Sequence, residues 1–303
     1  MSLVLSIFLN DITPVFALAA VGFLLARHAG AGVRTLSTVS FHALSPCLVF
    51  NQLVTSRVGV SQSWRVVVFC LLLTAALGVA ARMSASALRL ESTTLTSFLL
   101  VVMFSNSGNF ALPVVLFAFG KESLAFASVY FVTSAVLVYT FGVFVAASGR
   151  GSLRTALGRV AGVPAVWATI AAVAVLASGV SAPEAVMRPI GLLSDAAIPV
   201  MLLVLGMQLE RHTKPEHPAA VAAAVSLSLV VAPLMAFALA ALLGLDGPAR
   251  QASIIEASMP AAVVTTVLAL EFELDANFAT SVVMFSTLLS PFTLVLLIAY
   301  LQR

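Results

Sequence analysis

Long apolar stretches separated by short polar breaks are the feature that most constrains how this chain folds. With charged residues, glycines and prolines taken as the breaks, the chain contains ten such stretches. Each has roughly the 20 residues that a helix needs to cross a hydrocarbon core of about 30 Å. They are residues 4–26, 36–55, 64–84, 94–119, 123–147, 157–178, 186–209, 217–243, 250–271 and 276–300. We therefore expect an all-α polytopic membrane protein with ten transmembrane helices.

Composition argues against the main alternatives. Hydrophobic residues make up 61% of the chain and charged residues 9%, whereas a soluble domain carries about 45–50% and about 25%. The chain therefore has too few polar residues to cover a soluble globule. Strands of a membrane barrel alternate between polar and apolar residues over about 10 residues. The stretches in this chain are continuously apolar and do not show this alternation. The net charge of +3 is too small to indicate nucleic acid as a partner.

The distribution of Lys and Arg predicts the orientation of the chain in the bilayer. With the N-terminus outside, nine of the 15 basic residues flank the inner ends of the stretches and six flank the outer ends. An even number of helices then places both termini outside. The polar segments 148–157 and 210–218 face the cytoplasm in this arrangement.

The two halves of the chain resemble each other weakly. Residues 43–46 match residues 196–199, and residues 107–113 match residues 254–260, at offsets of 153 and 147 residues. Halves of five helices each lie in opposite orientations, which is the inverted-repeat arrangement of many secondary transporters. A proline shared by chance is the alternative explanation of the match. We expect a first repeat at 1–150 and a second at 151–303.

The fourth and ninth stretches contain helix-breaking residues in mid-span. In the fourth, Gly108 and Pro113 weaken a helix, and Asn106 and Asn109 need hydrogen-bond partners in hydrocarbon. In the ninth, Pro260 lies in mid-span. A proline kink that relieves packing strain is the alternative interpretation of each. Breaks at corresponding positions of the two halves favour a substrate site instead.

The residues at the two breaks predict what kind of ligand they bind. Proline suits the first turn of a helix, so Pro113 and Pro260 are each expected to begin a second half-helix. The N–H groups and positive dipole ends of both half-helices would face the break and favour a small anion. No Lys or Arg lies in mid-span, which leaves Asn106 and Asn109 as the side-chain donors. The expected substrate-binding residues are Asn106, Ser107, Gly108, Asn109, Pro113, Ser258 and Pro260.

Ionisable residues inside membrane spans are rare and tend to be functional. Glu256 lies in the ninth break, Asp195 lies four residues before Pro199, and His42 aligns with Asp195 between the repeats. These three residues are the candidates for ion coupling. Asp195 and His42 lie toward helix ends, where a structural cap or pair is the alternative role.

At these residues the sequence resembles the auxin efflux carrier family, specifically its bacterial members. Residues 106–113 are similar to the family's Asn-Thr-Gly-Asn-x-Gly-x-Pro segment, with Ala111 where glycine is usual. The family's signatures for helices 7, 9 and 10 are similar to residues 196–209, 256–263 with 268–272, and 286–290. The resemblance covers nearly the whole chain.

The resemblance implies ten helices in two inverted repeats, with helices 4 and 9 broken where they cross. It implies a scaffold domain of helices 1, 2, 6 and 7 that forms a homodimer. Helices 3–5 and 8–10 would form a transport domain that moves by elevator-type alternating access. Family members carry small organic anions: indole acetate in plants, and malate or malonate in some bacteria. The long cytoplasmic loop of plant carriers is reduced here to about residues 148–157, so its control by phosphorylation is not expected.

The expected function is secondary transport of a small carboxylate across a bacterial inner membrane, with both termini in the periplasm. The chain has no P-loop sequence that would indicate direct use of ATP. No cofactor is expected. Three modes of coupling stay open: a proton on Glu256, a sodium ion held by Glu256, Ser258 and backbone carbonyls, or uncoupled transport.

Two other classes of protein compete with a carrier. An intramembrane hydrolase would use Ser107 as nucleophile and His42 as base, but no third group orients the base. We therefore expect no enzyme activity. The other competitor is a membrane receptor that binds without transporting.

Overall fold

The structure, a computed structural model, describes residues 3–55, 60–147, 161–179, 182–210 and 217–303. Within these ranges the chain is helical, as the sequence predicts, and the only strand-like pairing is one isolated bridge. A helix satisfies its own backbone N–H and C=O groups, which a segment in hydrocarbon requires. Residues 148–157 and most of 210–218, predicted to face the cytoplasm, lie outside the described residues.

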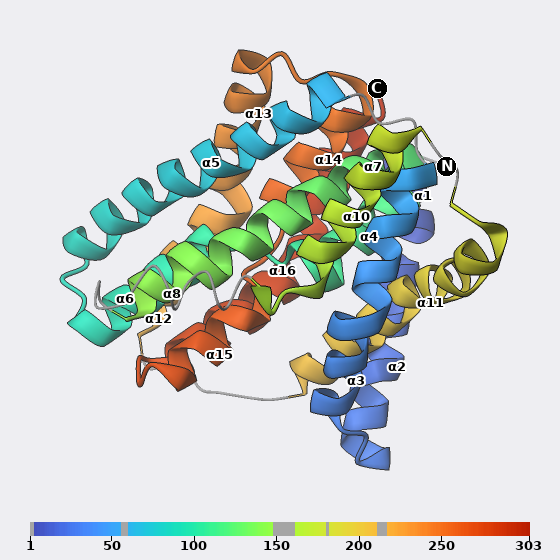
Figure 1. Cartoon of the computed structure of the whole chain (residues 1–303). Helices are drawn as coiled ribbons and strands as arrows, with labels where there is room; N and C mark the ends of the chain where they lie inside the picture. The colour runs from blue at the N-terminus through green and yellow to red at the C-terminus, as the bar shows by residue number, and fades with distance from the viewer. Residues whose placement is uncertain (1–2, 56–59, 148–160, 180–181, 211–216) are drawn as a thin grey trace.

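The helices follow the apolar stretches along the chain (Figure 1). They are α1 (Leu3–Ile7), α2 (Thr13–Ala29), α3 (Val33–Val39), α4 (Ser45–Thr55), α5 (Val60–Ala87), α6 (Ser92–Met103), α7 (Leu112–Leu137), α8 (Val143–Ala146), α10 (Pro164–Ser178), α11 (Glu184–Leu209), α12 (Pro218–Ser226), α13 (Ala232–Leu242), α14 (Gly247–Ala257), α15 (Val263–Glu271) and α16 (Ala276–Leu301). Short π-helical turns lie next to several of them: η1 (Phe8–Ile12), η2 (Ser40–Leu44), η3 (Ser107–Ala111), η4 (Val138–Gly142) and η5 (Leu227–Val231).

Six of the described helical segments are long and apolar enough to cross a membrane. They are Leu5–Ala29, Gln62–Ala87, Ser107–Ala146, Glu184–Leu209, Pro218–Leu242 and Ala276–Leu301. The chain is therefore a multi-pass membrane protein. The other expected spans fall on shorter helices, so the arrangement of ten helices in inverted repeats stays a prediction.

One of these six segments is divided by a glycine. Ser107–Ala146 has 40 residues, about twice the length that one span requires. Within it, Gly120 has φ 79° and ψ −168°, a conformation that interrupts the helix and that glycine adopts at little cost. The interruption coincides with the predicted boundary between the fourth and fifth stretches.

The fourth and ninth stretches are also interrupted, and the two interruptions lie side by side. Helix α6 ends at Met103 and α14 ends at Ala257, before the next helical segments begin at Ser107 and Val263. Between them, Ser105 and Ala261 form an antiparallel bridge. The N–H of Asn106 donates to the carbonyl of Pro260 at 2.8 Å, and the N–H of Ala262 donates to the carbonyl of Phe104 at 2.9 Å. Each unwound segment thus supplies the partners that the other needs.

Helices α2 and α11 approach each other closely because glycines lie at their contact. A Cβ atom on Gly22 would collide with the backbone of Leu203, and one on Gly206 would collide with the backbone of Ala19. Small residues allow this close approach in membrane helices. Figure 1 shows α2, α3, α4 and α11 grouped on one side, while α5, α6, α12 and α15 lie toward the other.

Candidate substrate-binding cavity

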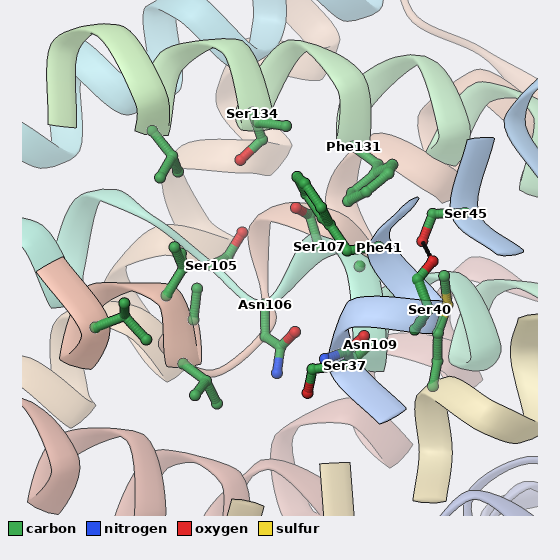
Figure 2. Close-up of a pocket in the computed structure, with 18 of the residues that line it drawn as sticks. Ser37, Ser40, Phe41, Ser45, Ser105, Asn106, Ser107, Asn109, Phe131 and Ser134 are labelled. Carbon is green, nitrogen blue, oxygen red and sulfur yellow. Dashed lines mark hydrogen bonds between the residues drawn. The ribbon is translucent and has the colours of Figure 1, made fainter. Parts of the chain in front are cut away.

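A cavity of about 320 Å³ lies against the two helix interruptions (Figure 2). Among the residues that the structure describes, none of the side chains lining the cavity is charged. Its polar lining consists of Ser37, Ser40, Ser45, Ser105, Asn106, Ser107, Asn109, Ser134, Tyr139 and Gln208. Its other lining residues are Phe41, Gly108, Phe131, Ala135, Val138, Met201, Ala262, Val263, Val264 and Val267. Serine hydroxyls and amides surrounded by apolar side chains are suited to a small polar molecule.

Asn106 is held by its backbone, while the Nδ2 atom of its side chain is left without a partner. Its N–H donates to the carbonyl of Pro260, and its own carbonyl accepts from the N–H of Ala111 at 3.1 Å. The residue is only 6% exposed, and its Nδ2 atom is buried without a hydrogen-bond partner. A buried donor left unpaired costs about 1–3 kcal/mol. An acceptor group in the cavity would remove that cost.

Two helix N-termini reach the cavity. The segment η3–α7 begins at Ser107 and α15 begins at Val263, and both residues line the cavity. The first N–H groups of a helix have no partner within it and carry partial positive charge. Together with the Asn106 amide, these ends make the cavity favourable to a small anion even though no described side chain in its lining is basic.

The two prolines lie elsewhere than predicted. Pro113 is in the first turn of α7, but η3 extends the helix toward the N-terminus, since the N–H of Ala111 bonds five residues back. Pro260 lies in the bridged segment, three residues before α15 begins. Neither proline begins the helical segment that follows its break, and neither lines the cavity.

The other predicted binding residues divide between the cavity and the protein interior. Ser107, Gly108 and Asn109 line the cavity, where a Cβ on Gly108 would approach the Phe131 ring at 2.9 Å. Ser258 does not line it, because its hydroxyl donates to the carbonyl of Ile254 at 2.6 Å in a fully buried position.

Glu256 is buried away from the cavity. Its exposure is 0%, and neither carboxyl oxygen has a hydrogen-bond partner. An unpaired buried carboxylate is strongly unfavourable, so this environment favours the neutral, protonated form.

His42 and Asp195 are not brought to Glu256 or to the cavity. Both side chains are exposed, and Nδ1 of His42 lies 3.1 Å from the carbonyl oxygen of Thr38 in its own helix. The cavity lining includes neither residue. The structure therefore gives no support to a role for these two residues in ion coupling.

Several cavity residues carry no strong signal in the sequence. The hydroxyls of Ser37, Ser40 and Ser45 come from the second stretch, and Gln208 comes from the end of the seventh. The Oε1 atom of Gln208 is also buried without a partner. An amide at the end of an apolar stretch is the one signal that could have identified Gln208.

Comparison with known proteins identifies the family of this chain. The sequence profile of a family described as membrane transport protein matches residues 7–161 and 150–298. The chain belongs to this family. It is the auxin efflux carrier-like family that the sequence resembles, so that prediction is confirmed.

Two relatives of this transport family member bear similar descriptions. A protein of Methanothermobacter thermautotrophicus, described as an uncharacterized transporter, is 29% identical over 259 residues, covering 84% of this chain and 85% of that protein. Another uncharacterized transporter, from Methanocaldococcus jannaschii, is 27% identical over 206 residues, covering 67% of each chain. The family and these descriptions indicate a transporter rather than an enzyme.

Proposed function

We propose that this protein is a secondary transporter of a small organic anion, and that a carboxylate of the substrate binds in the 320 Å³ cavity. The observation that carries the proposal is the Nδ2 atom of Asn106, which is buried and unpaired in the cavity wall. A carboxylate oxygen would accept from it. Membership of a transport family supports carriage across the membrane rather than catalysis.

Each part of the cavity has a place in this proposal. The carboxylate lies between Asn106 and the N-terminal ends at Ser107 and Val263, where N–H groups stabilise negative charge. The rest of the substrate contacts apolar side chains such as Phe41 and Phe131. Because the donors are neutral, binding is weak enough to permit release. A lysine or arginine in the same place would hold the anion more tightly.

The proposal extends to architecture and movement. We propose ten helices in inverted repeats at 1–150 and 151–303, with a scaffold domain of helices 1, 2, 6 and 7 that forms a homodimer. The moving domain consists of helices 3–5 and 8–10. The cavity lining supports elevator-type movement because residues of α3, α4 and α11 form one wall and the interrupted helices form the other. Sliding of one wall past the other would carry the substrate.

Orientation and location complete the proposal. Both termini face the periplasm of a bacterial inner membrane. The basic residues at the inner ends of the stretches support this orientation.

Coupling is proposed to involve a proton on Glu256. The buried and unpaired carboxyl favours a protonated residue, and a neutral Glu256 would not repel the anion. Sodium-coupled and uncoupled carriers of the same class are the alternatives.

A screen for binding tests the substrate class directly. Purified protein is heated with a panel of dicarboxylates and aromatic acids, and a ligand of the native state raises the melting temperature by mass action. At least one carboxylate is expected to raise it for wild type and for Asn51→Ala, and to raise it clearly less for Asn106→Ala at the same ligand concentration. Asn51 is a matched control because its amide donates to Ser194 outside the cavity. A receptor would give the same shifts without uptake into proteoliposomes.

A further inference from the structure

A serine of α16 contacts the paired helix interruptions from outside the cavity. The backbone N–H of Ala261 donates to the Oγ atom of Ser286 at 3.2 Å, and both residues are buried. The described lining of the cavity does not include Ser286. The bond therefore joins α16 to the interruption between α14 and α15 from a position where the serine cannot contact a bound substrate directly.

The need for this bond follows from how the two interruptions pair. Ala261 and Ser105 face each other in the antiparallel bridge, and the two hydrogen bonds that close the bridge are made by their chain neighbours. In a pair of this kind the facing residues do not bond to each other, so their own N–H and C=O groups point outward. The N–H of Ala261 must then find an acceptor on the outer side of the bridge. The hydroxyl of Ser286 is that acceptor.

The hydroxyl of Ser286 is oriented to accept. Its O–H donates to the carbonyl of Val283 in its own helix at 3.2 Å, which leaves the lone pairs of Oγ to accept from Ala261. Ser290 lies four residues further along α16 and is equally buried, but its hydroxyl only donates to the carbonyl of Thr287 at 2.8 Å. The two serines therefore differ in the bond to the bridge and are otherwise closely matched.

We propose that Ser286 is a positioning residue for substrate binding, because it holds the bridged segment to which Asn106 is bonded. Without this acceptor the buried N–H of Ala261 would be unpaired, which is unfavourable enough to shift the segment. The N–H of Asn106 is bonded to the carbonyl of Pro260 in the same segment, so Asn106 would lose its fixed place in the cavity wall. Figure 2 shows the Asn106 side chain next to Ser105 in that wall. The role rests on the proposed function, since it concerns the carboxylate that Asn106 would bind.

Amide hydrogen exchange tests the hold on the bridge without any substrate. Purified protein is transferred into D2O, and deuterium uptake is measured by mass spectrometry in the peptides that contain the amides of Asn106 and Ala262. In Ser286→Ala these amides should exchange about tenfold faster than in wild type because the bridge opens more often, although their own acceptors are unchanged. Ser286→Cys keeps the shape of the side chain with a much weaker acceptor, and it should also speed exchange. Ser290→Ala should exchange like wild type.

Affinity for a carboxylate separates positioning from general packing. The member of the dicarboxylate and aromatic acid panel with the largest thermal shift on wild type is titrated against each serine variant. Ser286→Ala and Ser286→Cys should need about fivefold more of that acid for the same shift. They should also raise the KM for its uptake by a similar factor, while the maximal rate stays within about twofold of wild type. Ser290→Ala should match wild type in both measurements.

The outcomes separate this role from the proposed function. Wild-type exchange of the Asn106 amide in the Ser286 variants would overturn the proposal, and so would faster exchange with unchanged affinity. If Ser286→Ala fails to fold, Ser286→Cys decides. If wild type binds a carboxylate and the Ser286 variants bind it equally well, the carrier proposal stands and the positioning role is removed. If no acid of the panel binds wild type, the proposed function fails, and the role of Ser286 in binding fails with it.

Discussion

The backbone N–H of Asn106 donates to the carbonyl of Pro260 at 2.8 Å, and this bond joins two helix interruptions that are far apart in sequence. It fixes the backbone of Asn106 at the cavity wall while the side-chain amide stays unpaired. The same bond uses the carbonyl of a residue that has no N–H of its own to donate. Unwound backbone is tolerated at membrane depth where protein or a water-filled cavity surrounds it, and here the two unwound segments pair with each other and lie against the cavity.

From the contact between α2 and α11 we expect alanine substitutions at two glycines of α11 to have very different effects on stability. Gly206→Ala should lower the stability of the protein, because its Cβ would meet the backbone of Ala19, and overpacking of this kind costs typically about 1–3 kcal/mol. Gly191→Ala should have little effect, since nothing lies within 4 Å of its added Cβ. The measurement is the melting temperature of the purified variants in detergent. Equal melting temperatures would contradict the observed contact.

Substitution of Gly108 is expected to change the affinity for the substrate rather than the stability of the fold. A methyl group at this position would approach the Phe131 ring at 2.9 Å, so the ring, which lines the cavity, would have to move. Gly108→Ala should therefore raise the KM for substrate uptake severalfold while the melting temperature changes little. Adding Phe131→Leu should restore part of the affinity because the shorter side chain makes room. No improvement in the double variant would show that the ring is not the obstacle.

Glu256 predicts the response to ion gradients. An imposed pH gradient should stimulate uptake by wild-type proteoliposomes, and Glu256→Gln should lose this stimulation because an amide does not bind and release a proton. A sodium gradient of the same size serves as the comparison. If sodium alone stimulates uptake, the proton proposal is wrong. Wild-type rates and an unchanged gradient response in Glu256→Gln would make the residue structural.

Cysteine accessibility tests the orientation. Glu91→Cys is expected to react with a membrane-impermeant maleimide only after the cells are opened, whereas Glu184→Cys should react in intact cells. Both positions are exposed, and the native Cys47 and Cys70 are replaced by alanine in both variants to remove background. The opposite pattern of labelling would invert the proposed topology.

Local signals explain which parts of the site were predictable. Gly108 and Pro260 weaken a helix wherever they occur, so both interruptions could be placed from the sequence alone. The start of the helix at Ser107, before Pro113, could not be placed from the sequence alone. The turn η3 that begins there depends on how the unwound segment packs against the one that contains Ala261. The pairing of Ser105 with Ala261 is likewise a long-range contact without a local pattern.

The serines show the same limit at the level of side chains. Ser128 and Ser134 both lie on α7 in an apolar sequence, yet only Ser134 lines the cavity. Ser128 donates instead to the carbonyl of Leu124, which is the usual arrangement for a serine within a membrane helix. The sequence around the two serines does not indicate which one lines the cavity, because that depends on the helices packed against each of them.

Uptake of labelled carboxylates by proteoliposomes tests the central claim most directly. Wild type and Asn51→Ala should take up at least one of the dicarboxylates or aromatic acids identified by thermal shift. Asn106→Ala should be folded and membrane-inserted, but its apparent affinity should fall about fivefold or more, as expected when a donor worth about 1–3 kcal/mol is lost. Unchanged uptake in Asn106→Ala would contradict the account, because the unpaired amide in the cavity wall would then have no part in binding.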